Sequence, residues 1–100
     1  MTGVQTCALP ISEDKFGGID IAVSNVSLRL HQTFFDISLD DWDRILRSNL
    51  SASFYLARAV LPGMQKGKWG RIIHLCGEDG FAGHHNQRAH AIVSKAGIHA

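Results

Sequence analysis

The side chains best suited to chemistry fall within one stretch of the chain, residues 70–97. His90 and Lys95 lie near its end. Because the unperturbed pKa of a histidine is near neutrality, His90 could act as a proton donor; a solvated loop histidine is the alternative. Lys95 lies one helical turn from Ala91, so the two side chains could meet. This stretch is the candidate site, and the elements around it must position it.

A loop inside this stretch carries a second group of polar residues. His84 and His85 are adjacent, and Glu78 and Asp79 precede them. Histidines and carboxylates are common metal ligands, but these spacings match no closed set of ligands. We therefore predict that the site contains no metal.

The residues around the site predict a strand, a loop and a helix. Residues 71–75 form an apolar, β-branched run interrupted by His74, which is typical of a strand buried on both faces in a parallel sheet. Cys76 follows it, where a free cysteine usually behaves as a small hydrophobe. After the loop, apolar side chains recur at helical spacing, at Ala89, Ile92, Val93 and Ala96.

The preceding part of the chain predicts the partner elements. Residues 19–23 are predicted as a second buried strand, and Asn25 stands in the turn that ends it. Ser38-Leu-Asp-Asp41 has the pattern of a capping box that opens a long helix near residues 39–65. The loop before it contains aromatic residues, which we expect to pack against this helix.

One face of the predicted long helix is apolar, and Asn49 lies on it. The other residues of this face are Trp42, Ile45, Leu46, Ser53, Leu56, Ala57, Val60 and Met64. A polar amide on such a face must find hydrogen-bond partners, because leaving it unpaired costs about 1–3 kcal/mol. Asn49 is therefore either a satisfied core residue at a helix irregularity or a functional residue.

In their order and spacing, these motifs resemble the short-chain dehydrogenase/reductase family over roughly residues 12–100. Gly70-Arg-Ile-Ile matches the family's strand, Ser94-Lys-Ala-Gly its helix, and Asn49-Leu-Ser a further motif. The resemblance implies an α/β fold: a fragment of a Rossmann-like, doubly wound parallel sheet, with one βαβ unit and the start of a further helix. It also implies an oxidoreductase that acts on an alcohol or carbonyl with NAD or NADP as cofactor.

The resemblance further implies roles for individual residues. Lys95 corresponds to the lysine that binds the nicotinamide ribose and assists a catalytic tyrosine, and Asn49 to an asparagine that helps to hold a proton-relay water. Asn25 is retained from an Asn-Asn-Ala-Gly turn that supports the cofactor pocket. The family's tyrosine falls on Ala91 and its serine on Gly77. The tyrosine that donates the proton in the family is therefore missing, and His90 is the remaining candidate for that role.

Two classes of function remain open. One is a dehydrogenase of this family with an altered acid/base group; the other is a non-catalytic homologue that binds a nucleotide or a partner. The balance of 10 basic and 9 acidic side chains favours neither nucleic acid nor a membrane, and no apolar run approaches the roughly 18 residues of a membrane span. We expect a cytoplasmic, homo-oligomeric parent protein with a small-molecule substrate.

Both ends of the chain look truncated. Residues 1–11 resemble the translation of a sequencing-library adapter, so we interpret them as a non-native segment and residues 12–100 as a partial NAD(P)-binding domain. The sequence has no Thr-Gly-x-x-x-Gly-x-Gly turn, the motif that holds the cofactor pyrophosphate in the family. We therefore expect the isolated fragment to bind no nicotinamide cofactor and to be inactive.

Overall fold

The computed structural model describes residues 3–83 and 88–100, and its main elements follow the predicted order. In chain order they are α1 (Gly3–Phe16), β1 (Ile21–Ser24), α2 (Leu39–Leu46), α3 (Ala52–Lys66), β2 (Arg71–His74) and α4 (Ala89–His99). Shorter helical turns lie between them, namely η1 (Phe34–Asp36), η2 (Arg47–Ser51) and η3 (Glu78–Gly80).

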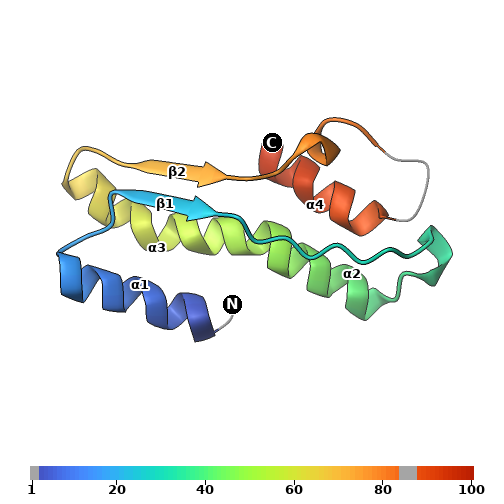
Figure 1. Cartoon of the computed structure of the whole chain (residues 1–100), viewed down its shortest axis with the longest axis horizontal. Helices are drawn as coiled ribbons and strands as arrows, with labels where there is room; N and C mark the ends of the chain where they lie inside the picture. Colours follow the sequence, from blue (N-terminus) through green and yellow to red (C-terminus); the bar gives the residue numbers. More distant parts are fainter. Residues whose placement is uncertain (1–2, 84–87) are drawn as a thin grey trace.

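The two strands are parallel and lie side by side (Figure 1). Ile21 pairs with Arg71, and the pairing continues to Ser24 opposite His74. The chain crosses between them through α2, η2 and α3, which follow one another as a single long helical segment (Figure 1). A parallel pair joined through a helix is a βαβ unit, so the predicted Rossmann-like fragment is confirmed.

The crossover helix begins where its sequence predicts. The side-chain oxygen of Ser38 accepts the backbone N–H of Asp41 at 3.0 Å, as in a capping box. Pro62 lies inside α3, which continues to Lys66. Gly67 follows as the C-terminal cap, so the helix ends at the glycine rather than at the proline.

The apolar core lies between the sheet and α3. It comprises Ala22 of β1 and Leu56, Val60 and Met64 of α3, with Ile72 of β2 packed against them. The α3 residues recur every four positions, so they form one stripe that faces the sheet. α4 lies near the other end of the long helical segment and packs against α2 and η2 (Figure 1).

The other face of the sheet is exposed, as we expect for a fragment whose helices cover one face, although the strand patterns are typical of strands buried on both faces. Ile21 and Val23 of β1 are 56% and 60% exposed, and Ile73 and Leu75 are exposed as well. Successive side chains of a strand point to opposite faces. Helices cover one face of each strand in this chain, so alternate apolar residues remain at the surface.

The aromatic residues of the loop after β1 do not pack against the long helix, and that prediction is wrong. Phe34 and Phe35 are 69% and 94% exposed. They lie in η1, where the hydroxyl of Thr33 donates to a carboxylate oxygen of Asp36 at 2.6 Å and fixes the turn. The two rings instead contact each other edge to face, with centroids 5.6 Å apart.

The N-terminal segment is helical in the structure. α1 runs from Gly3 to Phe16, and Gly17 adopts a φ of +83°, the left-handed conformation that commonly follows a helix. Leu9 packs against the core cluster. The predicted boundary between a non-native segment and the domain, after residue 11, lies inside α1. Because that prediction concerns the origin of residues 1–11 and not their conformation, it stays a prediction.

We expect the chain by itself to be marginally stable, because sheets of fewer than three strands rarely hold together alone and one face of this one is exposed. Heating the monomeric chain should give a gradual loss of helical circular dichroism without a cooperative transition. Val23→Lys, on the exposed face, is the control and should leave the profile unchanged. A sharp transition of the monomer that does not depend on concentration would contradict the prediction.

Candidate active site

A cavity of about 270 Å³ lies beyond the carboxyl ends of the two strands, the edge at which ligands bind in open α/β sheets. Its lining brings together three positions singled out from the sequence, Gly77, Ala91 and Lys95. The remaining lining residues are Arg29, Cys76, Glu78 and Arg88. This cavity is the candidate active site.

Lys95 connects α4 to the ends of both strands. Its side chain is only 5% exposed. The ammonium nitrogen donates to the backbone oxygen of Val26, beyond β1, at 3.3 Å and to that of Leu75, directly after β2, at 3.0 Å. A buried ammonium group needs such acceptors for its three N–H donors. The carbonyl groups at the two strand ends therefore fix this cation at the cavity wall.

Asn49 lies in η2, a π-helical turn, and is buried. Its side-chain oxygen accepts the backbone N–H of Leu28 at 2.7 Å, and its side-chain nitrogen donates to the backbone oxygen of Leu28 at 2.9 Å. The same nitrogen donates to the hydroxyl oxygen of Ser94 at 3.0 Å. The oxygen and the nitrogen of the Asn49 side-chain amide are therefore both hydrogen-bonded, and this asparagine holds the loop after β1 against the crossover helix.

Ser94 is a site residue whose contacts sequence reasoning missed. It is fully buried in α4, accepts from Asn49, and donates to the backbone oxygen of Ala91 at 2.7 Å. The sequence placed it only within the Ser-Lys-Ala-Gly motif. A hydroxyl between apolar neighbours on a helix needs a partner, and that signal could have linked it to Asn49.

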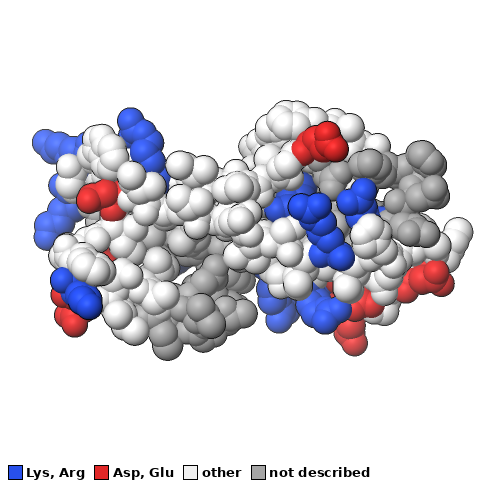
Figure 2. Space-filling model, in the orientation of Figure 1, with Lys and Arg blue, Asp and Glu red and all other residues white. Residues whose placement is uncertain are grey.

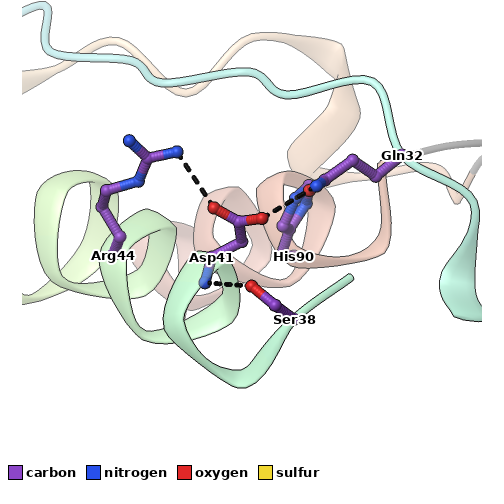
Figure 3. A network of polar contacts seen from close by, with 5 residues as sticks. All are labelled: Gln32, Ser38, Asp41, Arg44 and His90. Carbon is purple, nitrogen blue, oxygen red and sulfur yellow. Dashed lines mark hydrogen bonds and ion pairs between the residues drawn. The ribbon is translucent and has the colours of Figure 1, made fainter. Parts of the chain in front are cut away.

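His90 is completely buried in the first turn of α4, so its interpretation as a solvated loop histidine is wrong. Its Nε2 lies 3.0 Å from Oε1 of Gln32, and its Nδ1 accepts the backbone N–H of Ala91 at 3.0 Å. Gln32 in turn donates to a carboxylate oxygen of Asp41 at 2.8 Å (Figure 3). His90 is not among the described residues that line the cavity, and its ring is engaged with Gln32.

Gly77 has a backbone conformation that few other residues adopt. Its φ of +68° and ψ of −176° fall in a region that is essentially restricted to glycine. No atom lies within 4 Å of the position that a Cβ would occupy, so the surroundings leave room for a side chain. The backbone opposes one, because a strained residue of this kind costs about 1–3 kcal/mol.

Basic side chains border the cavity. Arg29 and Arg88 belong to its lining, together with the carboxylate of Glu78. Figure 2 shows basic side chains on both halves of the visible face, including a group over the half that contains α2 and α4. Asn25 is exposed just after β1 and, within the part of the chain that is described, does not line this cavity. Asn25 and Lys95 therefore lie at the same edge of the sheet without sharing the cavity.

Within residues 3–83 and 88–100, no group of three or more histidine, cysteine or acidic side chains could hold a metal ion. The loop pair His84 and His85 lies outside the described residues. No helix in those same ranges is both long and apolar enough to cross a membrane.

Comparison with known proteins identifies the family. The family model described as short chain dehydrogenase matches residues 7–100. The chain is 38% identical over 85 residues to a D-beta-hydroxybutyrate dehydrogenase of Rhizobium meliloti, covering 85% of this chain and 33% of the relative. It is 36% identical over 85 residues to a 3-oxoacyl-acyl-carrier-protein reductase of Vibrio cholerae, covering 85% and 34%. An acetoacetyl-CoA reductase of Cupriavidus necator is 28% identical over 87 residues, covering 87% and 35%.

The chain therefore belongs to the short-chain dehydrogenase family, and the relatives it matches are named as dehydrogenases and reductases. It spans about a third of the length of the relatives it matches.

The described residues fit the nicotinamide end of NAD(P). Open space beside the backbone of Gly77 allows a ligand to approach closely, and Lys95 places an ammonium group at the same cavity. We propose that Lys95 is the residue that would hold the ribose. The bound cofactor would supply the hydride.

The pKa of the Asp41 carboxyl group provides a test of the hydrogen-bond network drawn in Figure 3. The hydrogen bond from Gln32 is the largest of the causes that hold the pKa of Asp41 below its ordinary value of 3.8, and Ser38 and Arg44 add to it. A lowered folded-state pKa stabilises the fold above about pH 3.8, and this contribution is lost as the pH falls through the lower, folded value. We expect Gln32→Leu to raise the Asp41 pKa in an NMR titration, whereas His31→Leu, on the same loop, should not. An unchanged pKa in the Gln32 variant would contradict the assignment.

Two glycines near the site provide a matched pair. A Cβ on Gly80 would lie 3.1 Å from the backbone oxygen of Lys95, whereas a Cβ on Gly83 would meet nothing within 4 Å. Because the neighbour at Gly80 is backbone, we expect Gly80→Ala to lower the free energy of unfolding by about 1 kcal/mol or more. Gly83→Ala should be neutral. Urea denaturation of the full-length gene product measures both, and equal effects would show that η3 does not support α4.

Proposed function

We propose that this chain supplies the active-site edge of an NAD(P)-dependent oxidoreductase that interconverts an alcohol and a carbonyl. The observation that carries the proposal is the position of Lys95, which shares one cavity with Gly77 and Ala91 beyond the ends of two parallel strands. In doubly wound folds this edge is the ligand-binding edge. Membership of the short-chain dehydrogenase family supports the same class of reaction.

Three side chains receive roles in this proposal. Lys95 holds the nicotinamide ribose, and Asn25 supports the neighbouring part of the cofactor pocket. Asn49 holds the proton-relay water. One lone pair of its side-chain oxygen is occupied by the N–H of Leu28, and the second remains available as an acceptor, since an amide oxygen has two.

Ordinary dehydrogenase chemistry needs a proton donor, and the position expected to supply it holds an alanine, Ala91. The side chain of Ala91 can neither give nor take a proton, and losing a positioned general acid typically lowers a rate by about 10²–10⁴. The backbone at Gly77 also opposes a serine. This second observation favours the alternative function, a non-catalytic homologue that binds a nucleotide or a partner.

The relatives suggest a substrate class. Their names specify D-beta-hydroxybutyrate, 3-oxoacyl and acetoacetyl groups, each of which carries oxygen on the third carbon of an acyl chain. We infer a 3-oxoacyl or 3-hydroxyacyl compound as the substrate, with NAD or NADP as cofactor, and a cytoplasmic homo-oligomer as the complete enzyme.

Restoring the phenol tests the catalytic role of the site. Ala91→Tyr in the full-length gene product places a phenol one helical turn from Lys95 and should raise reduction of a 3-oxoacyl substrate by about 10² or more. Ala91→Phe is the control, with the same ring and no hydroxyl group. Gly77 stays unchanged in both variants because its backbone would be strained. No gain with tyrosine while NADH or NADPH still binds would favour the non-catalytic alternative.

The chain by itself should bind no nicotinamide cofactor. The pyrophosphate of a dinucleotide is held at a glycine-rich turn that opens a helix, and this sequence has no such turn. Calorimetric titration of the chain with NADH and NADPH should give no saturable heat, with the full-length gene product as the positive control. Saturable binding by the chain alone would overturn the expectation.

A further inference from the structure

The hydrogen bonds of His90 determine which of its nitrogens carries the proton. The backbone N–H of Ala91 can only donate, so Nδ1, 3.0 Å away, must accept and carries no proton. The neutral ring then has its proton on Nε2, which lies 3.0 Å from the side-chain oxygen of Gln32. Both nitrogens of the buried ring are therefore satisfied in one tautomer.

A chain of hydrogen bonds leads from His90 through Gln32 to Asp41 of α2 (Figure 3). Gln32 accepts from the ring through its oxygen and donates through its nitrogen to Oδ2 of Asp41 at 2.8 Å. The other carboxylate oxygen of Asp41 accepts from Arg44 at 3.0 Å. Each donor meets an acceptor, so reversing the amide of Gln32 would break two contacts at once.

The imidazole also takes the place of a helix cap. The first N–H groups of a helix have no partner within the helix and are usually satisfied by the side chain of the N-cap residue. Arg88 occupies that position, and its side chain makes no capping hydrogen bond. Nδ1 of His90 supplies the missing acceptor to Ala91, one residue further along.

We propose that His90 is a positioning residue and not the proton donor of the site. As a neutral imidazole with its proton on Nε2, it fixes the first turn of α4 against α2 through Gln32 and thereby sets the position of Ala91 and Lys95 at the cavity. An imidazolium ring carries N–H on both nitrogens and cannot accept from Ala91. Its buried ring is committed to Ala91 and Gln32, so passing a proton would break these contacts. The functional consequence for Lys95 rests on the proposed cofactor role; the tautomer does not.

Nitrogen-15 NMR of the full-length gene product reads the tautomer directly. We expect the His90 signals of an unprotonated Nδ1 and a protonated Nε2, with a hydrogen-bond correlation from the Ala91 amide to Nδ1. A proton on Nδ1, or a doubly protonated ring in the folded protein near neutral pH, would overturn the proposal. This readout does not depend on activity, so it stands or falls separately from the proposed function.

Two variants separate the two contacts of the ring. In His90→Asn the side-chain oxygen can still accept from Ala91 but is too short to reach Gln32; in His90→Leu both contacts are lost. We expect amide hydrogen exchange at Ala91 to accelerate about tenfold in the leucine variant and to change little in the asparagine variant. His31→Asn, at an exposed histidine, is the control and should behave as the wild type.

The effect on the site is measured as affinity for NADH or NADPH. Both His90 variants should weaken binding several-fold, because each releases α4 from Gln32, and Gln32→Leu should weaken it to the same extent. Unchanged affinity in Gln32→Leu and His90→Asn would overturn the positioning role. If His90→Leu does not fold, Gln32→Leu, His90→Asn and the wild-type tautomer still test the positioning role of His90. A wild type that binds no cofactor but shows the expected tautomer would refute the proposed function and leave the structural assignment intact.

Discussion

The ammonium group of Lys95 joins the ends of two strands that the sheet alone would leave loosely connected. The ladder between β1 and β2 is short, and the chain then diverges into two separate loops. A cation shared by the backbone oxygens of Val26 and Leu75 keeps these loops together at the point where the cavity begins. Removing it would leave two carbonyl groups without this partner, so the cavity wall depends on one side chain from α4.

Polar contacts connect α4 to three other parts of the fold. Of its buried residues, His90 reaches α2 through Gln32, Ser94 reaches η2 through Asn49, and Lys95 reaches both strand ends. The apolar cluster lies elsewhere, between the sheet and α3. Hydrogen bonds are directional, whereas apolar contacts tolerate small displacements. We therefore expect these polar contacts to fix the position and orientation of α4 more than they stabilise its attachment.

Local patterns predicted the strands, the crossover helix and α4, whereas α1 was not predicted and long-range contacts decided the rest. The capping box at Ser38 and the apolar stripe of α3 are visible in consecutive residues, so the crossover helix could be predicted. The burial of His90 depends on Gln32, which is 58 positions away, and no local pattern reveals such a pair. The positive φ of Gly77 is equally invisible in the sequence, because a glycine at a strand end is compatible with many turns.

The conformation of Gly77 also bears on how this sequence could change over generations. In a relative with serine at this position, the backbone must hold a conformation that a residue with a Cβ tolerates. With the turn at a φ of +68°, a single change of Gly77 to serine meets backbone strain before it can give any benefit. Neighbouring residues would have to reshape the turn first. The order of substitutions therefore matters, because a serine at position 77 would fit only after the turn had changed.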